Sequence, residues 1–152
     1  MNWKQPKVYA VKHKDEATRA ASRSGGIFTA LSDQVLSNGG VVYGCVLTDK
    51  FDAVHICADN EEDRNRMRGS KYIQSKLGDT FKSVRADLDA QKSVLFSGTS
   101  CQVAGLKNYF GKEYDNLFCV DIVCHGVPSK KVWNAYLRWQ EQKNHSKIAS
   151  VD

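Results

Sequence analysis

The sequence predicts an α/β fold, with a mixed, partly parallel sheet that is flanked by helices and incomplete at the C-terminus. In the second half of the chain, strand-like apolar runs alternate with helical patterns, which is the order typical of parallel pairing. The runs at 93–96 and 117–123 are continuously apolar, as in strands that are covered on both faces. With 152 residues, 41% of them hydrophobic, the chain has room for one domain with its own core.

The first half of the chain contains both strand and helix signals. The run Val41 to Leu47 is a strong strand signal. The segment Asn38-Gly39-Gly40 before it ends a helix whose apolar face includes Ile27, Leu31 and Val35. The other elements expected here are a short strand over 8–12, a second hairpin strand over 53–57, and helices over 59–67 and 79–90.

The second half is more regular. A strand over 93–96 leads into a helix over 101–110, and the strand over 117–123 precedes a helix that Pro128 opens and that runs to about 142. Residues 143–152 are polar and are expected to lead into a missing C-terminal part. The sequence therefore predicts a single, partial domain over 1–152.

The charge and the N-terminus exclude several classes of protein. The net charge is +5, from 22 basic and 17 acidic residues, and no basic run exceeds two, so nucleic acid is not expected as a partner. No apolar run approaches the roughly 18 residues of a membrane span, and the N-terminus lacks the apolar core of a signal peptide. We therefore expect a cytoplasmic protein.

The five cysteines set a second limit on function. An odd number without a secretion signal argues against a disulfide framework, and without a Cys-x-x-Cys there is no zinc knuckle or thioredoxin motif. Cys45 and Cys57 fall inside predicted strands, so we expect them in the core. The remaining thiols are candidates for buried groups, a nucleophile or metal ligands.

Two loops follow the predicted parallel strands, and both carry reactive side chains. Ligands of open α/β sheets bind outside the carboxyl ends of the strands, which meet at one edge. Cys101 and Gln102 follow one strand, and Cys124 and His125 follow the other, so we expect these four to converge. Cys119 precedes Cys124 by an odd offset and is assigned to the other face.

Two further segments have a binding interpretation and a structural one. Ser22-Arg23-Ser24-Gly25-Gly26 precedes a helix. The free N–H groups of a helix N-terminus bind anions, but ordinary helix capping also explains a segment of this composition. In Gly69-Ser70-Lys71-Tyr72, the lysine suits a phosphate and the tyrosine suits a stacked ring. Neither segment is a complete phosphate-binding motif.

A thiol enzyme is a separate hypothesis. The strand, the segment Gly98-Thr99-Ser100-Cys101-Gln102 and the following helix approximate a nucleophile elbow, but the glycine required after the nucleophile is absent. Cys101 or Cys124 could still attack a substrate with His125 as the base.

Four ordered motifs together resemble one known family. They are Ser22–Phe28 (SRSGGIF), Arg68–Ser75 (RGSKYIQS), Phe96–Leu106 (FSGTSCQVAGL) and Cys124–Ser129 (CHGVPS). In this order they are similar to the beta subunits of coenzyme F420 hydrogenases and dehydrogenases, and the resemblance covers about residues 7 to 140.

The resemblance implies a flavoprotein that holds FAD near a 4Fe–4S cluster. It would pass electrons between a hydride carrier, coenzyme F420 or a similar compound, and a ferredoxin-like or other iron–sulfur partner. By this resemblance Cys101 and Cys124 are the cluster ligands, which suits soft thiolates. The candidate catalytic residue is His125, from its place beside Cys124 and before Gly126. The residues expected around the flavin are Ser22, Ser24, Gly25, Gly26, Lys71, Tyr72, Gly98, Thr99 and Gln102.

The chain also departs from the family pattern. Ser100 replaces a usual proline, and the ferredoxin-like segment and the C-terminal cysteine pair of longer members are missing. Only two plausible cluster thiolates remain where four are needed. We therefore expect a fragment of the full enzyme. The alternatives left open by the residues are the thiol enzyme and a non-catalytic remnant or interaction module.

Overall fold

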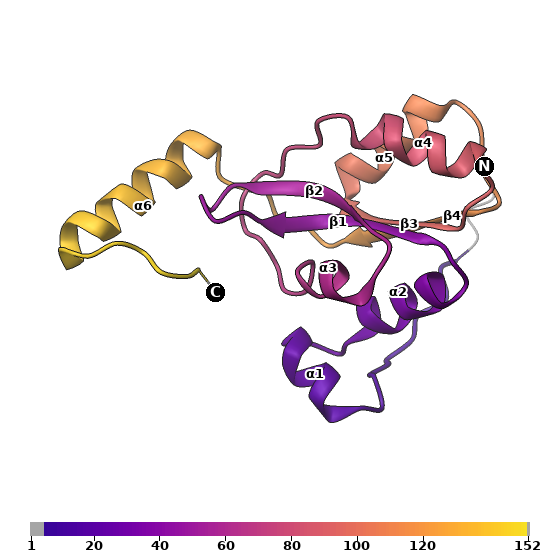
Figure 1. Cartoon of the computed structure of the whole chain (residues 1–152), viewed down its shortest axis with the longest axis horizontal. Coiled ribbons are helices and arrows are strands. Elements are labelled where there is room, and N and C mark those ends of the chain that lie inside the picture. Colours follow the sequence, from indigo (N-terminus) through magenta and orange to yellow (C-terminus); the bar gives the residue numbers. More distant parts are fainter. Residues whose placement is uncertain (1–4, 152) are drawn as a thin grey trace.

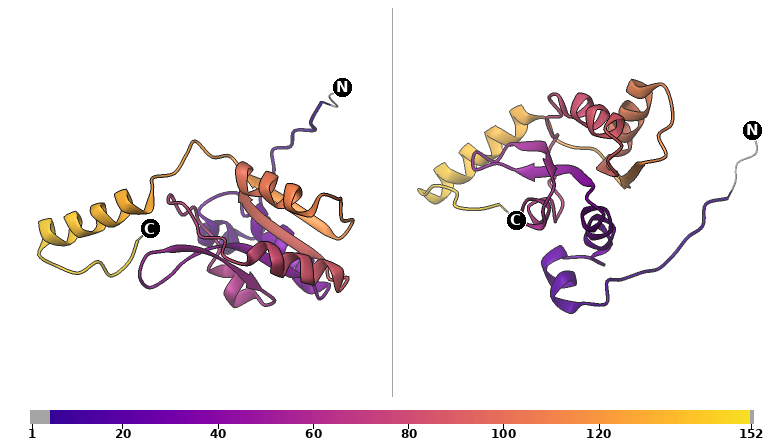
Figure 2. Two further views of the ribbon diagram at one scale, coloured as in Figure 1. Left: turned by 90° about the horizontal axis from the view of Figure 1, so that it is seen from above. Right: turned by 45° about the vertical axis from the view of Figure 1, so that its right-hand side comes forward.

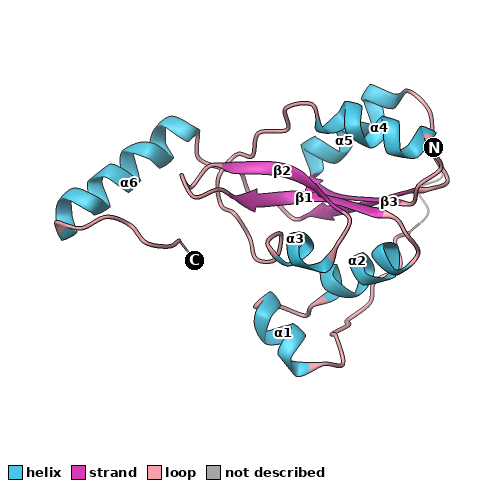
Figure 3. Cartoon of the chain, in the orientation of Figure 1, coloured by secondary structure: helices cyan, strands magenta, loops and turns pink. Residues whose placement is uncertain are grey.

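A four-stranded mixed sheet forms the centre of the molecule in the computed structural model, which describes residues 5–151 (Figures 1 and 3). The strand order is β2-β1-β3-β4. The β1–β2 pair is antiparallel, whereas β1–β3 and β3–β4 are parallel. The strands are β1 (Val41–Leu47), β2 (Ala53–Ala58), β3 (Val94–Thr99) and β4 (Leu117–Ile122). The expected mixed, partly parallel sheet is confirmed.

Helices cover both faces of this sheet (Figure 1). Helices α4 (Thr80–Asp89) and α5 (Ser100–Phe110) lie on one face, and α2 (Ile27–Ser37) and α3 (Glu61–Asn65) lie on the other. Helix α1 (Glu16–Ser22) lies beyond α2, and α6 (Lys130–Asn144) projects past the end of the β1–β2 hairpin (Figures 1 and 2). Among the helices of residues 5–151, none combines the length and apolarity of a membrane-crossing helix.

Alternation along the strands divides the core into two layers. On the side of α4 and α5, the buried cluster consists of Val41, Tyr43, Val84, Leu88, Val94, Phe96, Val103 and Leu106. On the side of α2 and α3, it consists of Val35, Val42, Val46, Ala58, Met67 and Leu95. The two central strands, β1 and β3, contribute to both layers, which explains their continuous apolar sequence.

Local capping fixes the helix that follows β3. Thr99 and Gln102 form a capping box at the start of α5, and Gly111 ends the helix in the left-handed region with φ 66°. The strand β3 therefore extends to Thr99, three residues beyond the expected end. This extension brings the strand directly into the helix, without an intervening loop.

The structure corrects three expectations and adds one helix. Residues 8–12 form no strand, because this exposed segment leaves the body without pairing to the sheet (Figure 2). The polar stretch before the first glycines forms α1, which Asp15 caps by accepting a hydrogen bond from the Thr18 N–H. Strand β4 is an edge strand and not a doubly covered one, with Phe118 53% exposed. Cys57 is exposed and not in the core, since β2 is the opposite edge.

Candidate functional site

The segments that carry Cys101 and Cys124 begin at the same edge of the sheet, since Cys101 lies in the first turn of α5 and Cys124 lies in the loop after β4. In the β3–β4 register Thr99 is paired with Ile122, and each cysteine lies two residues beyond its member of this pair. The Ser100 hydroxyl donates a hydrogen bond to Asp121 Oδ1 (2.8 Å), which ties the start of α5 to the end of β4.

Both thiols at this edge are exposed. Cys101 Sγ lies 3.1 Å from Thr99 Oγ1, and Cys124 Sγ accepts a hydrogen bond from the Gly126 N–H (3.3 Å). Within residues 5–151, no three His, Cys, Asp or Glu side chains gather as metal ligands would. The described part of the chain thus offers two thiols at one edge but no complete metal site.

A polar network lies next to this edge, and it joins three segments of the chain. Gln102 Oε1 accepts a hydrogen bond from the Thr99 N–H (3.0 Å), and Gln102 Nε2 donates to Ser75 Oγ (2.8 Å). Ser75 in turn hydrogen-bonds the Cys45 side chain. Burial raises the pKa of the Cys45 thiol, against the opposing charge of Lys71 and the bond from Ser75. Sequence reasoning selected Thr99 and Gln102 but missed Cys45 and Ser75.

Lys71 is turned toward the backbone of its own loop. Its ammonium group donates to the carbonyl oxygens of Arg66 (3.0 Å), Arg68 (2.8 Å) and Gly69 (3.2 Å), just beyond the end of α3. Burial lowers the pKa of this amine. All three N–H donors are thus occupied, and Lys71 offers a nearby anion its charge without a free donor. Tyr72 beside it is 79% exposed.

The glycines before α2 are packed against the segment that precedes α1. The His13 N–H donates to the Gly25 carbonyl (2.7 Å). Gly26 has φ 75°, and a Cβ atom there would lie 2.9 Å from His13 Cβ. Gly26 is the N-cap of α2 and supplies no side-chain cap, so N–H groups of the first turn have no side-chain acceptor from that position. Ser22 Oγ lies 3.3 Å from Thr29 Oγ1, and Ser24 is exposed.

Two arginines reach the first turn of α2 from outside. Arg68 Nε donates to Thr29 Oγ1 (3.1 Å), and Arg64 Nη1 donates to the Thr29 carbonyl (3.0 Å). Burial and the neighbouring charge of Arg64 lower the pKa of Arg68. Sequence reasoning missed both side chains, although Arg68 opens the second motif. Arg64 is buried and paired with Asp33, so the uncapped helix N–H groups and the Arg68 guanidinium are the groups that make this turn suitable for an anion.

A buried histidine lies behind the polar network. His55 is 9% exposed, stacks on Phe96, and contacts the Ser97 carbonyl through Nε2 (3.1 Å). Because a carbonyl only accepts, Nε2 carries the proton, and Nδ1 has no hydrogen-bond partner among residues 5–151. Burial lowers the pKa of His55. The residue also lines a cavity of about 340 Å³. No motif in the sequence indicated this residue.

His125 is exposed, and among the described residues no hydrogen bond joins it to Cys101 or Cys124. The backbone brings the three residues to one region, but it does not assemble a thiol–imidazole pair there. Gly98 is buried at the end of β3, where a Cβ atom would lie 3.0 Å from Gln102 Oε1. The small residue therefore makes room for the amide that caps α5.

Comparison with known proteins gives matches in the family models and in the solved structures. The model "coenzyme F420 hydrogenase/dehydrogenase, beta subunit N-term" matches residues 8–82, and the corresponding C-terminus model matches residues 91–152. No curated protein matches the chain.

One solved structure with a similar fold is the F420-reducing NiFe hydrogenase complex from Methanosarcina barkeri in a xenon derivative. The TM-score is 0.70 at 20% sequence identity, over 92% of this chain and 50% of the matched chain. The chain therefore spans half the length of that neighbour. Since two models of one family match in chain order, the chain belongs to the coenzyme F420 hydrogenase/dehydrogenase beta-subunit family of oxidoreductases.

Proposed function

We propose that this chain is a flavin- and iron–sulfur-dependent oxidoreductase domain. It passes electrons between a hydride carrier, coenzyme F420 or a similar compound, and an iron–sulfur protein partner. The observation that carries the proposal is the occurrence of Cys101 and Cys124 at equivalent positions beyond two adjacent parallel strands. Family membership and the multi-subunit nature of the structural neighbour support a protein partner.

The residues at the start of α2 fit the diphosphate of FAD. Arg68, the N–H groups of the first turn and the Ser22 hydroxyl form a donor set suited to phosphate oxygens. The network of Thr99, Gln102 and Ser75 would meet the polar edge of the ring system. When bound, a flavin takes up two electrons as a hydride and releases them singly.

The residues present do not complete a 4Fe–4S site. Such a cluster takes four thiolates, and Cys101 and Cys124 supply two. Within the described ranges no third ligand of the usual types joins them. We therefore derive no electron-transfer step through a cluster, and we propose only that these two thiolates are part of its ligand set.

The thiol-enzyme alternative lacks comparable support. A Cys–His mechanism needs the imidazole within hydrogen-bonding reach of the sulfur. For the described atoms of His125, no such bond to either thiol is present.

The test is an absorbance spectrum of the anaerobically purified chain, with iron and flavin assays on the same sample. We expect flavin bands, and we expect iron where a second copy of the chain or a partner supplies the remaining thiolates. Cys101→Ser and Cys124→Ser should each reduce the iron to the background of the assay and retain the flavin, because each removes a ligand but leaves α2 intact.

Cys57→Ser is the matched control. It replaces an exposed thiol on β2, and this variant should retain as much iron as the wild type. Equal iron in both ligand variants and the wild type would contradict the assignment, and a colourless folded chain would contradict cofactor binding by these residues alone.

A further inference from the structure

The loop between β4 and α6 has no support from the core. Residues 121–132 are exposed throughout, and this stretch includes Cys124, His125 and Gly126, which has φ 125°. Helix α6 has no buried residue. The position of the loop is therefore set by its two ends, of which β4 fixes the first.

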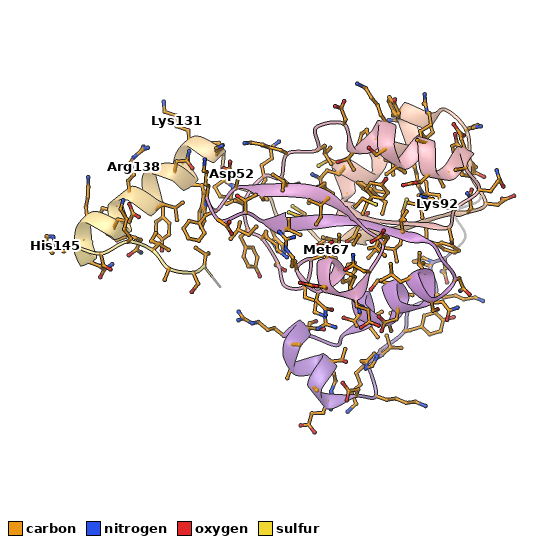
Figure 4. The ribbon with its side chains drawn as sticks, in the orientation of Figure 1. Asp52, Met67, Lys92, Lys131, Arg138 and His145 are labelled. Atoms are coloured by element: carbon orange, nitrogen blue, oxygen red, sulfur yellow. The ribbon has the colours of Figure 1, made fainter. Side chains whose placement is uncertain are left out.

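The second end is attached to the tip of the β1–β2 hairpin. Lys130 Nζ lies 2.8 Å from Asp52 Oδ1, and Trp133 Nε1 donates to the Phe51 carbonyl (2.8 Å). Both contacts come from the first turn of α6. Figure 4 shows Asp52 at the hairpin tip, beside the start of that helix.

The hairpin tip is itself firmly held. The Phe51 N–H donates to the Thr48 carbonyl (2.8 Å), and the Thr48 N–H donates to the Asp52 carbonyl (2.9 Å). The Thr48 side chain accepts from the Asp52 N–H (3.1 Å), and Lys76 pairs with the Asp52 carboxylate (3.1 Å). Phe51 has φ 56°, in the left-handed region, and its carbonyl accepts the Trp133 bond. A closed turn of this kind is a rigid anchor for the segment that binds it.

We propose that this hairpin clamp, made of Asp52 and the Phe51 carbonyl, positions the loop that carries Cys124 and His125. By holding Lys130 and Trp133, the clamp fixes the far end of the loop and keeps Cys124 at the sheet edge next to Cys101. The proposal rests on the proposed role of Cys124 as a cluster ligand. Asp52, Lys130 and Trp133 are positioning residues, because they act through the loop and do not touch the thiol.

The test uses two matched pairs of variants in the full chain. Lys130→Met and Trp133→Phe each remove one clamp contact. Lys131→Met and Trp139→Phe make the same chemical changes at exposed positions of α6 that have no hydrogen bond or ion pair to the hairpin within residues 5–151. Lys131 points away from the hairpin in Figure 4. Lys130→Arg keeps the charge and should retain the clamp.

The first readout is hydrogen exchange of the amides of Val132 and Trp133, which are hydrogen-bonded to Ser129 at the end of the loop and are protected only while that end is held. We expect exchange about 3- to 10-fold faster in Lys130→Met and Trp133→Phe, and wild-type rates in the two controls and in Lys130→Arg. Wild-type exchange in both clamp variants would overturn the proposal. So would equally fast exchange in the controls, because the effect would then not depend on the hairpin.

The second readout is iron retained after anaerobic reconstitution and gel filtration, and it separates the clamp from the proposed function. If the wild type holds iron, the clamp variants should lose it faster than the controls. Equal retention would overturn the positioning role. If the wild type holds no iron, the proposed function fails, and the exchange rates still decide whether the hairpin holds the loop.

Discussion

At the residue scale, His55 combines burial with an unsatisfied polar atom. Its Nε2 is bonded to the Ser97 carbonyl and its ring lies on Phe96, whereas its Nδ1 has no partner in the part of the chain that the structure describes. Protonation would place a charge in this buried position, and this is why the pKa of His55 is lowered. The residue therefore makes the folded state sensitive to pH.

The sign of this effect follows from proton binding. In the unfolded chain His55 titrates near its ordinary pKa of 6.5, whereas in the folded chain it titrates lower. Between the two values the unfolded chain binds more protons, so stability is complete above about 6.5 and is lost as the pH falls through the folded pKa. We expect the free energy of unfolding, measured in urea at several pH values, to fall as the pH is lowered from about 7.5 to about 5.5.

The matched variant is His55→Gln, which keeps a side-chain N–H for the Ser97 carbonyl and does not titrate. Its unfolding free energy should vary less steeply over the same pH range. An unchanged slope would show that His55 is not the group responsible.

The polar network shows how far single residues could be predicted. Thr99 and Gln102 were identified from their place after a strand, and they lie in the network. Cys45 was assigned to the core, yet it is only half-buried and contacts Ser75. Strand periodicity gives the face of the sheet on which Cys45 lies. It does not give the contact with Ser75, because the loop that carries Ser75 is far from Cys45 in the sequence.

At the element scale, Arg64 joins α3 to α2. It is 1% exposed, lies 2.6 Å from Asp33 Oδ1, and donates to Ser32 Oγ (2.8 Å). A helix of five residues such as α3 has little stability of its own, so this side chain holds it in place. Hydrophobic periodicity gave no sign of such a contact, because a charged residue is normally expected at the surface.

We expect Arg64→Met to lower the free energy of unfolding by about 2–3 kcal/mol, measured by urea denaturation. The change leaves buried acceptors on α2 without donors, although the exposure of Asp33 limits the loss. Arg66→Met is the control, since Arg66 is 55% exposed in its pair with Asp63, and a change below about 0.5 kcal/mol is expected. Equal effects of the two substitutions would contradict a special role for Arg64.

Whole elements were predicted well where the pattern was local. The helices α2, α4 and α5 and the strands β1 and β2 were expected within one or two residues of their observed bounds. The error at β4 has a physical cause. Its sequence is as apolar as that of a central strand, but it lies at the edge of the described sheet, and sequence does not give strand order.

At the scale of the whole molecule, a packed body carries one projecting helix. Helix α6 extends beyond the hairpin and has no buried residue, whereas α5 buries Val103 and Leu106 in the core (Figures 1 and 2). Most helical stability in proteins comes from such tertiary packing. We therefore expect α6 to open locally far more often than α4 or α5.

Limited trypsin digestion followed by mass spectrometry tests this difference. Cleavage after Arg138 and Lys143 of α6 should be about 10-fold faster than after Lys82 of α4 and Lys107 of α5. All four side chains are exposed, so they differ in the helix that carries them and not in access to the side chain. Cleavage at Lys107 as fast as at Arg138 would show that α6 is no less stable than the body.

By itself, the sequence determined the α/β class, most helix and strand bounds and the motifs that mark the family, because periodicity, capping and motif spacing are local properties of the chain. Tertiary structure alone decided that β4 is an edge strand, that Arg64 and Arg68 converge on α2, and that the hairpin tip holds the start of α6. These features depend on contacts between residues up to about 80 positions apart, such as Asp52 and Lys130. Such contacts exist only once the sheet has fixed the relative positions of the strands and helices, and no local pattern encodes them.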